Sequence, residues 1–419
     1  MMQGAKATAF SLRMTSAAAF LLPALALWVP SGYSYAALLL LLGALCFAPA
    51  WLRRGPDRYT LGLCLLMVGM GCMWFVLTLD VGVNRWDKGI KWLLGALCLL
   101  YLAAYPPRPS FFRAGLPIGC VGMGCLALWQ VFHLGLDRAN GFTNAIQWGN
   151  LALLLACLTA VLLAVFWRPS RWPWRLGMML AVVLGFAASL LSQSRGGWLA
   201  VLAVVPLWLW WVWRIRPQRF GRLLGALALA LAALALVLAF TPRFNDRVEQ
   251  AAAEITGYVH SGQENTSVGN RLAQYHLVAD MIPAKPWLGW GAHGFVQEMQ
   301  RRVDAGEYAP QMMHYPEVHN IFLDAWVKVG VGGVLLQAVL LGWVLVMFWP
   351  SRQRLARHAT DSPPWREALA LRVMGSTVPV CYFVFGLSQP FFNHNSGIMC
   401  FVFYVAVLWA ALQGVEGDG

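Results

Sequence analysis

Apolar runs long enough to cross a lipid bilayer recur along most of this chain. A helix needs about 17–25 predominantly apolar residues to span roughly 30 Å of hydrocarbon. Hydrophobic residues make up 59% of the 419 residues and charged residues only 12%, whereas a soluble domain is about half apolar and about a quarter charged. The alternating segments of about ten residues that are typical of a transmembrane β-barrel are absent from the sequence. We therefore predict an all-α fold, that of a polytopic helical membrane protein.

Hydropathy predicts about twelve membrane spans. The first apolar run follows Lys6 and Arg13 and resembles a signal peptide. Because no small-residue cleavage site precedes the next run, we interpret it as a retained helix. The predicted spans cover residues 15–31, 33–52, 60–80, 90–105, 115–135, 148–167, 174–193, 196–213, 222–241, 320–349, 372–390 and 396–414.

One long polar segment, residues 241–319, interrupts this pattern. The predicted organisation is nine spans within 1–240, the polar segment, and three spans within 320–419. Turn residues and hydrophobic periodicity predict that the segment is folded. Arg301 and Arg302 are interpreted as a solvated helix face. The expected elements are a short helix at 246–255, a loop at 257–269, an amphipathic helix at 270–281 and a helix at about 296–305.

The distribution of charge predicts the orientation in the membrane. With the N-terminus inside, the loops on the inner side carry 19 of the 31 Lys and Arg residues but only 5 of the 18 acidic residues. This is the positive-inside bias of membrane proteins. Both termini are therefore expected in the cytoplasm and the polar segment on the outer side. The basic character of the chain reflects topology and contact with anionic lipid headgroups, and not a nucleic-acid partner.

The positions of the cysteines and histidines predict neither a disulfide framework in the polar segment nor a metal site. None of the nine cysteines lies in the polar segment, so no disulfide framework is predicted there. His314 and His319 are separated by four residues with only Glu317 between them that could join as a ligand, and this spacing matches no strong metal-binding pattern. We therefore predict an activity that needs no metal and no cofactor.

His319 and Asn320 stand at the predicted junction between the polar segment and the tenth span. A neutral imidazole at this position is suited to general-base catalysis near neutral pH, because its ordinary pKa is about 6.5. The alternative is an interfacial histidine whose polar tip reaches water. His314 and Asn320 are secondary candidates.

Three arginines lie on the predicted outer face. Arg195 stands between two apolar runs in Ser194-Arg195-Gly196-Gly197, where the glycines allow close backbone approach. Arg271 lies near the start of the amphipathic helix, and Arg138 lies in the loop before the sixth span. Each arginine alone could be an interfacial anchor or a solvated side chain. Together they are suited to hold a lipid-linked diphosphate, because guanidinium binds phosphate in a bidentate manner.

These patches together resemble the O-antigen ligase and polymerase superfamily of bacterial envelope polysaccharide assembly. The similarity covers roughly residues 130–415, and the order and spacing of the patches make the set more specific than any one of them. The chain departs from the family pattern at Asn144-Ala145, where many relatives have Asn-Pro. The patches are Ser194–Gly197, Gly269-Asn270-Arg271, Pro286–Phe295 and His319–Gly333.

The resemblance implies a glycosyltransferase at the outer face of the inner membrane of a Gram-negative cell. The donor would be an O-antigen polysaccharide on undecaprenyl diphosphate, and the acceptor the terminal sugar of the lipid A–core. By this resemblance His319 would take the proton of the acceptor hydroxyl, while Arg195 and Arg271 would bind the diphosphate as it leaves.

Three other functions fit the same sequence features. A repeat-unit polymerase of the same superfamily would differ only in its acceptor. A protein O-oligosaccharyltransferase would transfer the glycan to Ser or Thr, although such enzymes usually carry a larger outer domain. A lipid-glycan flippase or transporter would also explain about twelve spans, but it would show charged residues in mid-span and paired broken helices in two matching halves.

Overall fold

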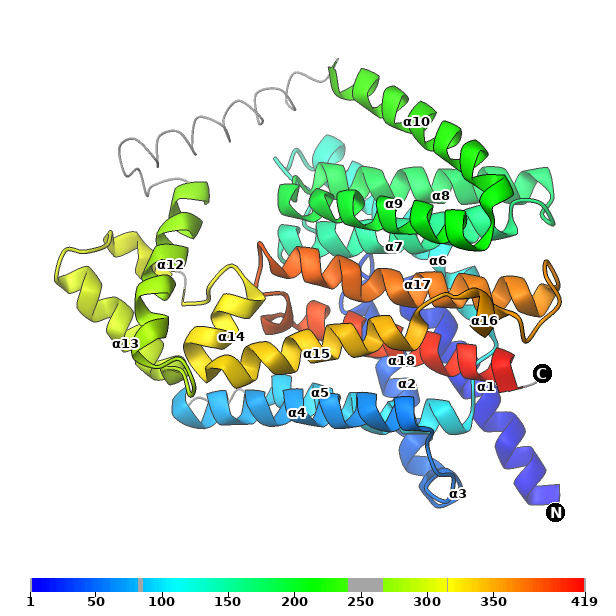
Figure 1. The fold of residues 1–419 in the computed structure, drawn as a ribbon, viewed down its shortest axis with the longest axis horizontal. Coiled ribbons are helices and arrows are strands. Elements are labelled where there is room, and N and C mark those ends of the chain that lie inside the picture. The colour runs from blue at the N-terminus through cyan, green and yellow to red at the C-terminus, as the bar shows by residue number, and fades with distance from the viewer. Residues whose placement is uncertain (1, 82–85, 240–266, 315, 418–419) are drawn as a thin grey trace. The chain divides into compact units, whose positions relative to one another are not determined.

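The computed structural model describes residues 2–81, 86–239, 267–314 and 316–417. Within these ranges every regular element is a helix, which confirms the all-α prediction (Figure 1). The α-helices are α1 (Met2–Leu25), α2 (Gly32–Cys46), α3 (Ala48–Trp51), α4 (Arg58–Val81), α5 (Asp87–Ala104), α6 (Pro109–Leu128), α7 (Ala145–Phe166), α8 (Trp172–Leu191), α9 (Arg195–Ile215), α10 (Pro217–Ala239), α12 (Ser267–Met281), α13 (Gly291–Asp304), α14 (Ile321–Val329), α15 (Val331–Phe348), α16 (Arg352–Leu355), α17 (Pro363–Gly386) and α18 (Asn395–Gly417).

Nine helices within the described ranges are long and apolar enough to cross a membrane. The other three predicted spans correspond to α2, α5 and α10. Helix α2 is apolar but has only 15 residues, and α5 carries Asp87, Lys88 and Lys91 in its first turns. The nine candidate spans are Thr8–Leu25, Arg58–Leu77, Pro109–His133, Ala145–Phe166, Trp172–Leu191, Arg195–Ile215, Val331–Phe348, Pro363–Gly386 and Asn395–Gly417.

The predicted tenth span, residues 320–349, is wrong as a single helix. It consists of α14 and α15, which are separated by Gly330 at a φ of 81°. That backbone conformation ends α14, because only glycine adopts it without steric cost. The candidate span is α15 alone. His319 and Asn320 therefore precede a separate nine-residue helix and not the membrane span itself.

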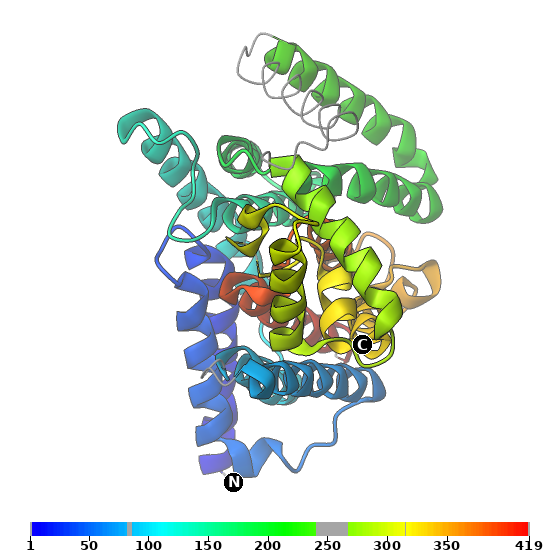
Figure 2. The same cartoon turned by 90° about the vertical axis from the view of Figure 1, so that its left-hand side faces the viewer.

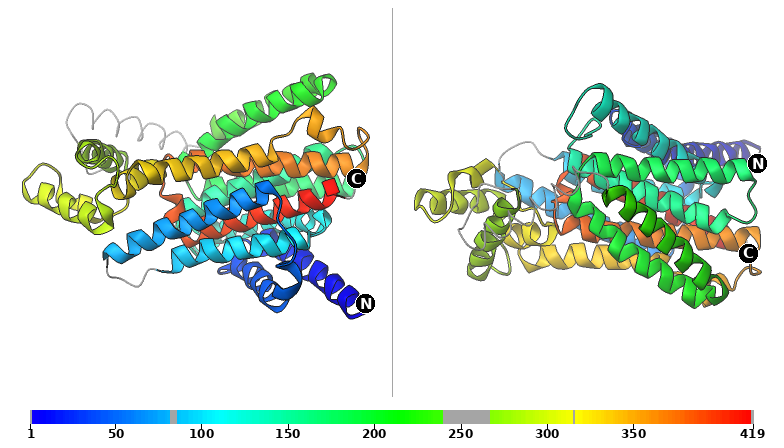
Figure 3. Two further views of the ribbon diagram at one scale, coloured as in Figure 1. Left: turned by 60° about the horizontal axis from the view of Figure 1, so that its bottom comes forward. Right: turned by 90° about the horizontal axis from the view of Figure 1, so that it is seen from above.

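The chain divides into two compact units. The first comprises the described residues of Met1–Phe75, Asn84–Val204 and Leu336–Gly419, and the second those of Val76–Val83 and Val205–Leu335. In the first unit most helix axes share one direction (Figure 1, Figure 3). Helix α18 lies at its centre, packed against α17, α5 and α2. Helices α7, α17 and α18 are mostly buried, whereas α8 and α9 have few buried residues and present apolar side chains such as Leu202 outward, as expected for lipid contact.

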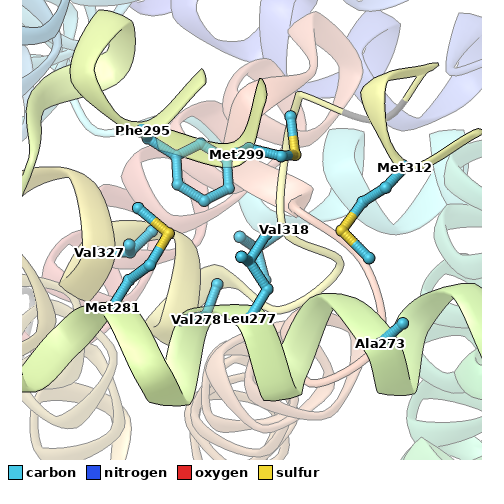
Figure 4. Close-up of a cluster of buried hydrophobic side chains, with 9 residues drawn as sticks. All are labelled: Ala273, Leu277, Val278, Met281, Phe295, Met299, Met312, Val318 and Val327. Atoms are coloured by element: carbon cyan, nitrogen blue, oxygen red, sulfur yellow. The ribbon is translucent and has the colours of Figure 1, made fainter. Parts of the chain in front are cut away.

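The second unit contains a small hydrophobic core of its own, formed where α12, α13 and α14 meet (Figure 2, Figure 4). This core confirms that the later part of the polar segment is folded, with α12 close to its predicted bounds. Helix α13 begins at Gly291, five residues earlier than predicted, and the segments predicted at 246–255 and 257–266 lie outside the described residues. The buried members of the core are Ala273, Leu277, Val278, Met281, Phe295, Met299, Met312, Val318 and Val327.

Arg301 and Arg302 differ in their surroundings, and the interpretation of both as a solvated face is wrong for Arg302. Arg301 is 61% exposed and pairs with Glu298, whereas Arg302 is only 16% exposed. The guanidinium of Arg302 lies 2.9 Å from Glu298 and also approaches Asp280 and Glu307. Hydrogen bonds from Arg301, and then from Arg302, lower the pKa of Glu298 to about 2. Arg302 thus joins α13 to α12, while Arg301 remains a surface residue.

Candidate active site around His319

The backbone and ring of His319 are held by two consecutive residues of α12. The Nδ1 atom of His319 lies 2.9 Å from the amide oxygen of Gln274. The hydroxyl of Tyr275 donates to the main-chain carbonyl of His319 at 2.9 Å. Gln274 is buried, and Tyr275 and His319 are half-buried. Ring and backbone are therefore fixed by separate hydrogen bonds from one helix.

The contact with Gln274 selects a tautomer of the imidazole. The amide nitrogen of Gln274 points toward the main-chain carbonyl of Glu317, at 3.5 Å, so the amide oxygen faces the histidine. Because an amide oxygen only accepts hydrogen bonds, Nδ1 must carry the proton. In the neutral ring the lone pair then resides on Nε2. This nitrogen is the one with the basicity that proton abstraction requires.

Arg271 lies on the same face of α12 as these two residues. Positions 271, 274 and 275 are three and four residues apart, so their side chains are neighbours on the helix surface. Burial raises the pKa of Tyr275, and the positive charge of Arg271 opposes that shift. Arg271 is half-buried. The second unit therefore brings together two of the predicted site residues, Arg271 and His319, with Tyr275 between them.

Asn320 acts as the N-cap of α14. Its side-chain oxygen accepts hydrogen bonds from the backbone N–H groups of Phe322 at 2.9 Å and Leu323 at 3.2 Å. An Asn at this position satisfies donors that have no partner within the helix. The helix start immediately after His319 is thus fixed by the neighbouring residue of the same motif.

A buried ion pair holds the turn before His319. Asp324 and Lys328 are each 8% exposed, and their charged atoms lie 2.6 Å apart. The same carboxylate oxygen accepts the backbone N–H of Val318 at 2.9 Å. The ammonium of Lys328 also donates to the carbonyl of Pro316 at 3.3 Å. The turn leading to His319 is therefore bonded to α14 at two points, Pro316 and Val318.

The Pro286–Phe295 motif braces the far end of α14. The carbonyl of Pro286 accepts the backbone N–H of Val331 at 2.9 Å and the indole N–H of Trp326 at 3.2 Å. The backbone N–H of Trp290 donates to the carbonyl of Val327 at 2.7 Å. Gly289 has a φ of 69°, and a Cβ there would collide with the backbone at Lys328. The motif thus fixes α14 in place.

Arg195 and Arg138 belong to the first unit, where their loops lie together. The backbone N–H of Ala139 donates to the carbonyl of Leu191 at 2.9 Å, and the side chain of Gln193 donates to the carbonyl of Asp137 at 2.6 Å. Both arginines are half-buried. Within the described residues the guanidinium of Arg195 has no hydrogen-bond or ion-pair partner. The charge of Arg195 is thus not neutralised by a described acidic group.

A buried glutamine shapes the loop that carries Arg138. Gln130 lies in a π-helical turn, η1 (Trp129–His133), that ends the helix begun as α6. Its side-chain oxygen accepts the backbone N–H groups of Asn140 and Gly141, at 3.0 Å and 2.9 Å. Downstream, Asn144 caps α7 through a hydrogen bond from Ile146, and Ala145 is the first helical residue. Proline is equally suited to that first position, so the departure from Asn-Pro leaves the local fold intact.

The two glycines after Arg195 allow the close approach that the sequence predicted. A Cβ on Gly197 would collide with the amide oxygen of Asn150 in α7, and one on Gly196 would collide with the side chain of Ser388. Asn150 is buried, and its amide oxygen accepts the hydroxyl of Ser194. The start of α9, and with it Arg195, is therefore set directly against α7.

His314 lies apart from the contacts that hold His319. It ends a 3₁₀ turn, η3 (Pro310–His314), is exposed, and has its Nδ1 atom 3.1 Å from the carbonyl of Gln311 in the same turn. Among the described residues no group of three His, Cys, Asp or Glu side chains is arranged to hold a metal ion. Metal independence remains a prediction.

Sequence reasoning missed four residues of this site: Gln274, Tyr275, Asp324 and Lys328. The spacing of Gln274 and Tyr275 from Arg271 was a usable signal, because it places them on one helical face. The spacing of Asp324 and Lys328, four residues apart on a helix that follows His319, was another. Their partners in the turn 316–319 follow only from tertiary structure.

Comparison with known proteins gives three findings. The family model described as O-antigen ligase matches residues 180–338, a range that contains all four patches of the resemblance. An uncharacterized protein of Haemophilus influenzae is 25% identical over 388 residues, which are 89% of this chain and 94% of that protein. A general O-oligosaccharyltransferase of Acinetobacter baylyi is 27% identical over 221 residues, or 50% of this chain and 36% of that protein. The resemblance inferred from the motifs is confirmed.

The contact between Gly197 and Asn150 can be tested by mutation. We expect Gly197→Ala to lower the free energy of unfolding by about 1–3 kcal/mol, because the added methyl group must displace a buried, hydrogen-bonded amide. Gly177→Ala in α8 is the control, since a Cβ there meets open space, and it should leave stability unchanged or slightly raised. Thermal unfolding of the purified proteins in detergent measures both. Equal melting temperatures for Gly197→Ala and the unmodified protein would contradict this packing.

Proposed function

Because the chain carries an O-antigen ligase family region, we propose that it transfers O-antigen polysaccharide from undecaprenyl diphosphate to the lipid A–core. The observation that carries this proposal is the arrangement of His319. Its ring is held in one tautomer by Gln274, at the start of a capped helix, beside a helix face that also presents Arg271. That arrangement supplies a base and a cation, which are the two groups that transfer from a diphosphate donor requires.

His319 acts as the general base in this proposal. Nε2 takes the proton of the acceptor hydroxyl while the hydroxyl oxygen forms a bond to the anomeric carbon of the donor sugar. The bond between the anomeric carbon and the phosphate oxygen breaks, and its electron pair leaves with undecaprenyl diphosphate. No nucleotide is required, because the diphosphate-linked sugar is already activated.

Arg271 and Arg195 bind the diphosphate. As the glycosidic bond to phosphate breaks, negative charge increases on the leaving oxygen, and a fixed guanidinium stabilises that charge. A divalent metal performs this task in other enzymes. Arg195 supports this role because no described group neutralises its charge. Arg138, in the loop next to the turn before Arg195, is a secondary diphosphate ligand, and we assign His314 and Asn320 no chemical step.

The site faces the periplasm in this proposal, with both termini in the cytoplasm of a Gram-negative cell. The excess of Lys and Arg in the predicted inner loops supports that orientation. It places the 241–319 segment on the side where lipid-linked polysaccharide and lipid A–core meet after export. The same proposal includes the predicted arrangement of the membrane spans, with nine spans before the 241–319 segment and three after it.

A protein acceptor is the second candidate. The match to a general O-oligosaccharyltransferase favours it, although this chain spans only about a third of that relative. A repeat-unit polymerase remains the third candidate, since it uses the same donor chemistry. The acceptor distinguishes all three: lipid A–core for the ligase, a Ser- or Thr-containing polypeptide for the oligosaccharyltransferase, and another lipid-linked repeat unit for the polymerase.

The decisive experiment supplies purified protein and undecaprenyl-diphosphate-linked glycan with each acceptor in turn, with and without EDTA. We expect glycan to appear on lipid A–core, and transfer to survive the chelator. His319→Ala should lower the rate by about 10²–10⁴-fold, the usual contribution of a general base, whereas His314→Ala should retain most activity. Transfer only to polypeptide or to a second repeat unit would reassign the acceptor. Near-normal transfer by His319→Ala, or complete loss with EDTA, would refute the mechanism.

The arginines can be tested by changes that keep the charge. We expect Arg195→Lys and Arg271→Lys each to lose most of the transfer activity, because an ammonium cannot make the bidentate contact of a guanidinium with phosphate. Arg301→Lys is the matched control, since Arg301 is a surface residue whose only hydrogen-bond partner among the described residues is Glu298. Arg302 is not a suitable control, because its half-buried guanidinium approaches three acidic residues. Full activity of Arg195→Lys would show that Arg195 is only an interfacial anchor and does not bind the diphosphate.

The role of Gln274 can be tested through the pH dependence of transfer. A carboxylate at this position would favour the charged imidazole and raise the pKa of His319. Because the base must be neutral, Gln274→Glu should shift the acid limb of the rate profile to higher pH. Gln274→Leu removes the acceptor and should lower the rate by about 10–100-fold at every pH. Gln300→Glu, an exposed change of the same charge on α13, should leave the profile in place. Superimposable profiles for Gln274→Glu and the unmodified protein would exclude this role.

A further inference from the structure

Two large apolar side chains project from the second unit without cover. Trp287 is 74% exposed and Leu288 is 85% exposed. They occupy the tip of the turn between η2 (Ile282–Ala284) and α13. The next residues along the chain toward α12 include Lys285, which is also exposed. An apolar tip of this size, flanked by a cation, indicates a contact with something other than water.

This turn is fixed to the first residue of a candidate membrane span. The carbonyl of Pro286 accepts the backbone N–H of Val331 at 2.9 Å, and Val331 is where the candidate span Val331–Phe348 begins. Gly330 packs against the carbonyl of Trp287 so closely that a Cβ on Gly330 would collide with it. The turn and the beginning of α15 therefore lie at the same level.

The beginning of that span is itself uncovered. Leu335, on the first turns of α15, is 57% exposed, so apolar surface continues from the turn onto the helix. The end of a membrane span lies at the boundary between hydrocarbon and headgroups, where Trp and Lys side chains are concentrated. Trp presents a large apolar body with one polar N–H, and Lys presents a charge that suits lipid phosphates.

We propose that the turn Lys285–Leu288 is an interfacial anchor, in which Trp287 and Leu288 insert into the lipid bilayer beside the start of α15. The surface that covers these apolar side chains is the outer leaflet of the lipid bilayer and not a protein, because the apolar surface is continuous with a membrane span. The anchor would fix the level of the α14–α15 junction. Since nine helical residues extend about 13.5 Å, it would also hold His319 close to the membrane surface. The proposal concerns lipid contact and does not depend on the reaction.

Depth-dependent fluorescence quenching tests this contact. The full chain, with its nine free cysteines replaced, receives one cysteine at Leu288, is labelled with an environment-sensitive fluorophore and is reconstituted in nanodiscs of phosphatidylethanolamine and phosphatidylglycerol. Lipids that carry a nitroxide at the headgroup, at acyl carbon 5 or at acyl carbon 12 serve as quenchers. We expect the label at 288 to be quenched at least twofold more by the two shallow nitroxides than by the deep one.

Two positions provide matched controls. Ala305→Cys places the label on an exposed residue at the opposite end of α13, about 20 Å from Gly291 by helix length, and it should respond to aqueous iodide but not to the lipid nitroxides. Leu335→Cys should respond to the lipids. Quenching at 288 that matches Ala305→Cys would overturn the proposal. So would protection of 288 from both iodide and lipid quenchers, because this would mean that protein covers the tip.

Discussion

One buried carboxylate holds the turn on which the candidate site depends. Asp324 binds the backbone of Val318 and the ammonium of Lys328, which in turn binds the carbonyl of Pro316. Removing two charges from water costs several kcal/mol each, and such a pair is tolerated only when the remaining hydrogen-bonding capacity is used. Here the remaining hydrogen bonds of the pair are made with the backbone just before His319. The acidic partner lies toward the N-terminus of α14 and the basic partner at its C-terminus, the arrangement that the helix dipole favours.

The interruption between α14 and α15 follows from the same requirement to satisfy polar groups. A helix that ends in hydrocarbon would leave N–H and carbonyl groups without partners, and lipid supplies none. At this break the N–H of Val331 is satisfied by Pro286, and that of Gly330 by Trp326. The Pro286–Phe295 motif is therefore needed because α14 is separate from the span. In turn the separation places the buried ion pair of α14 outside the candidate span α15.

Most of the fold could be predicted from the sequence because it depends on local patterns. Apolar length identified the nine candidate spans, although it also predicted spans at α2, α5 and α10, and turn residues and periodicity identified α12. The break at Gly330 could not be predicted, because α14 and α15 form one apolar run and only the contact with Trp287 reveals the change of backbone direction. Arg302 was misassigned for a similar reason: its sequence neighbours are those of a surface helix, and its partner Asp280 lies on another element. Of the site, the motifs predicted His319 and the arginines as candidates, but the contact of Gln274 with the imidazole joins residues 45 positions apart.

The neutral character of the groups that hold His319 suits the proposed reaction. A carboxylate orients the histidine in many hydrolases and also stabilises the imidazolium. Next to a diphosphate donor, an ionised carboxylate would repel the substrate and compete for the arginines that bind it. The amide of Gln274 fixes the tautomer without adding a charge, and the hydroxyl of Tyr275, whose pKa is raised by burial, stays protonated while it holds the backbone. The acidic group nearest along α14, Asp324, is neutralised by Lys328. The described groups that hold the imidazole therefore add no net negative charge beside an anionic substrate.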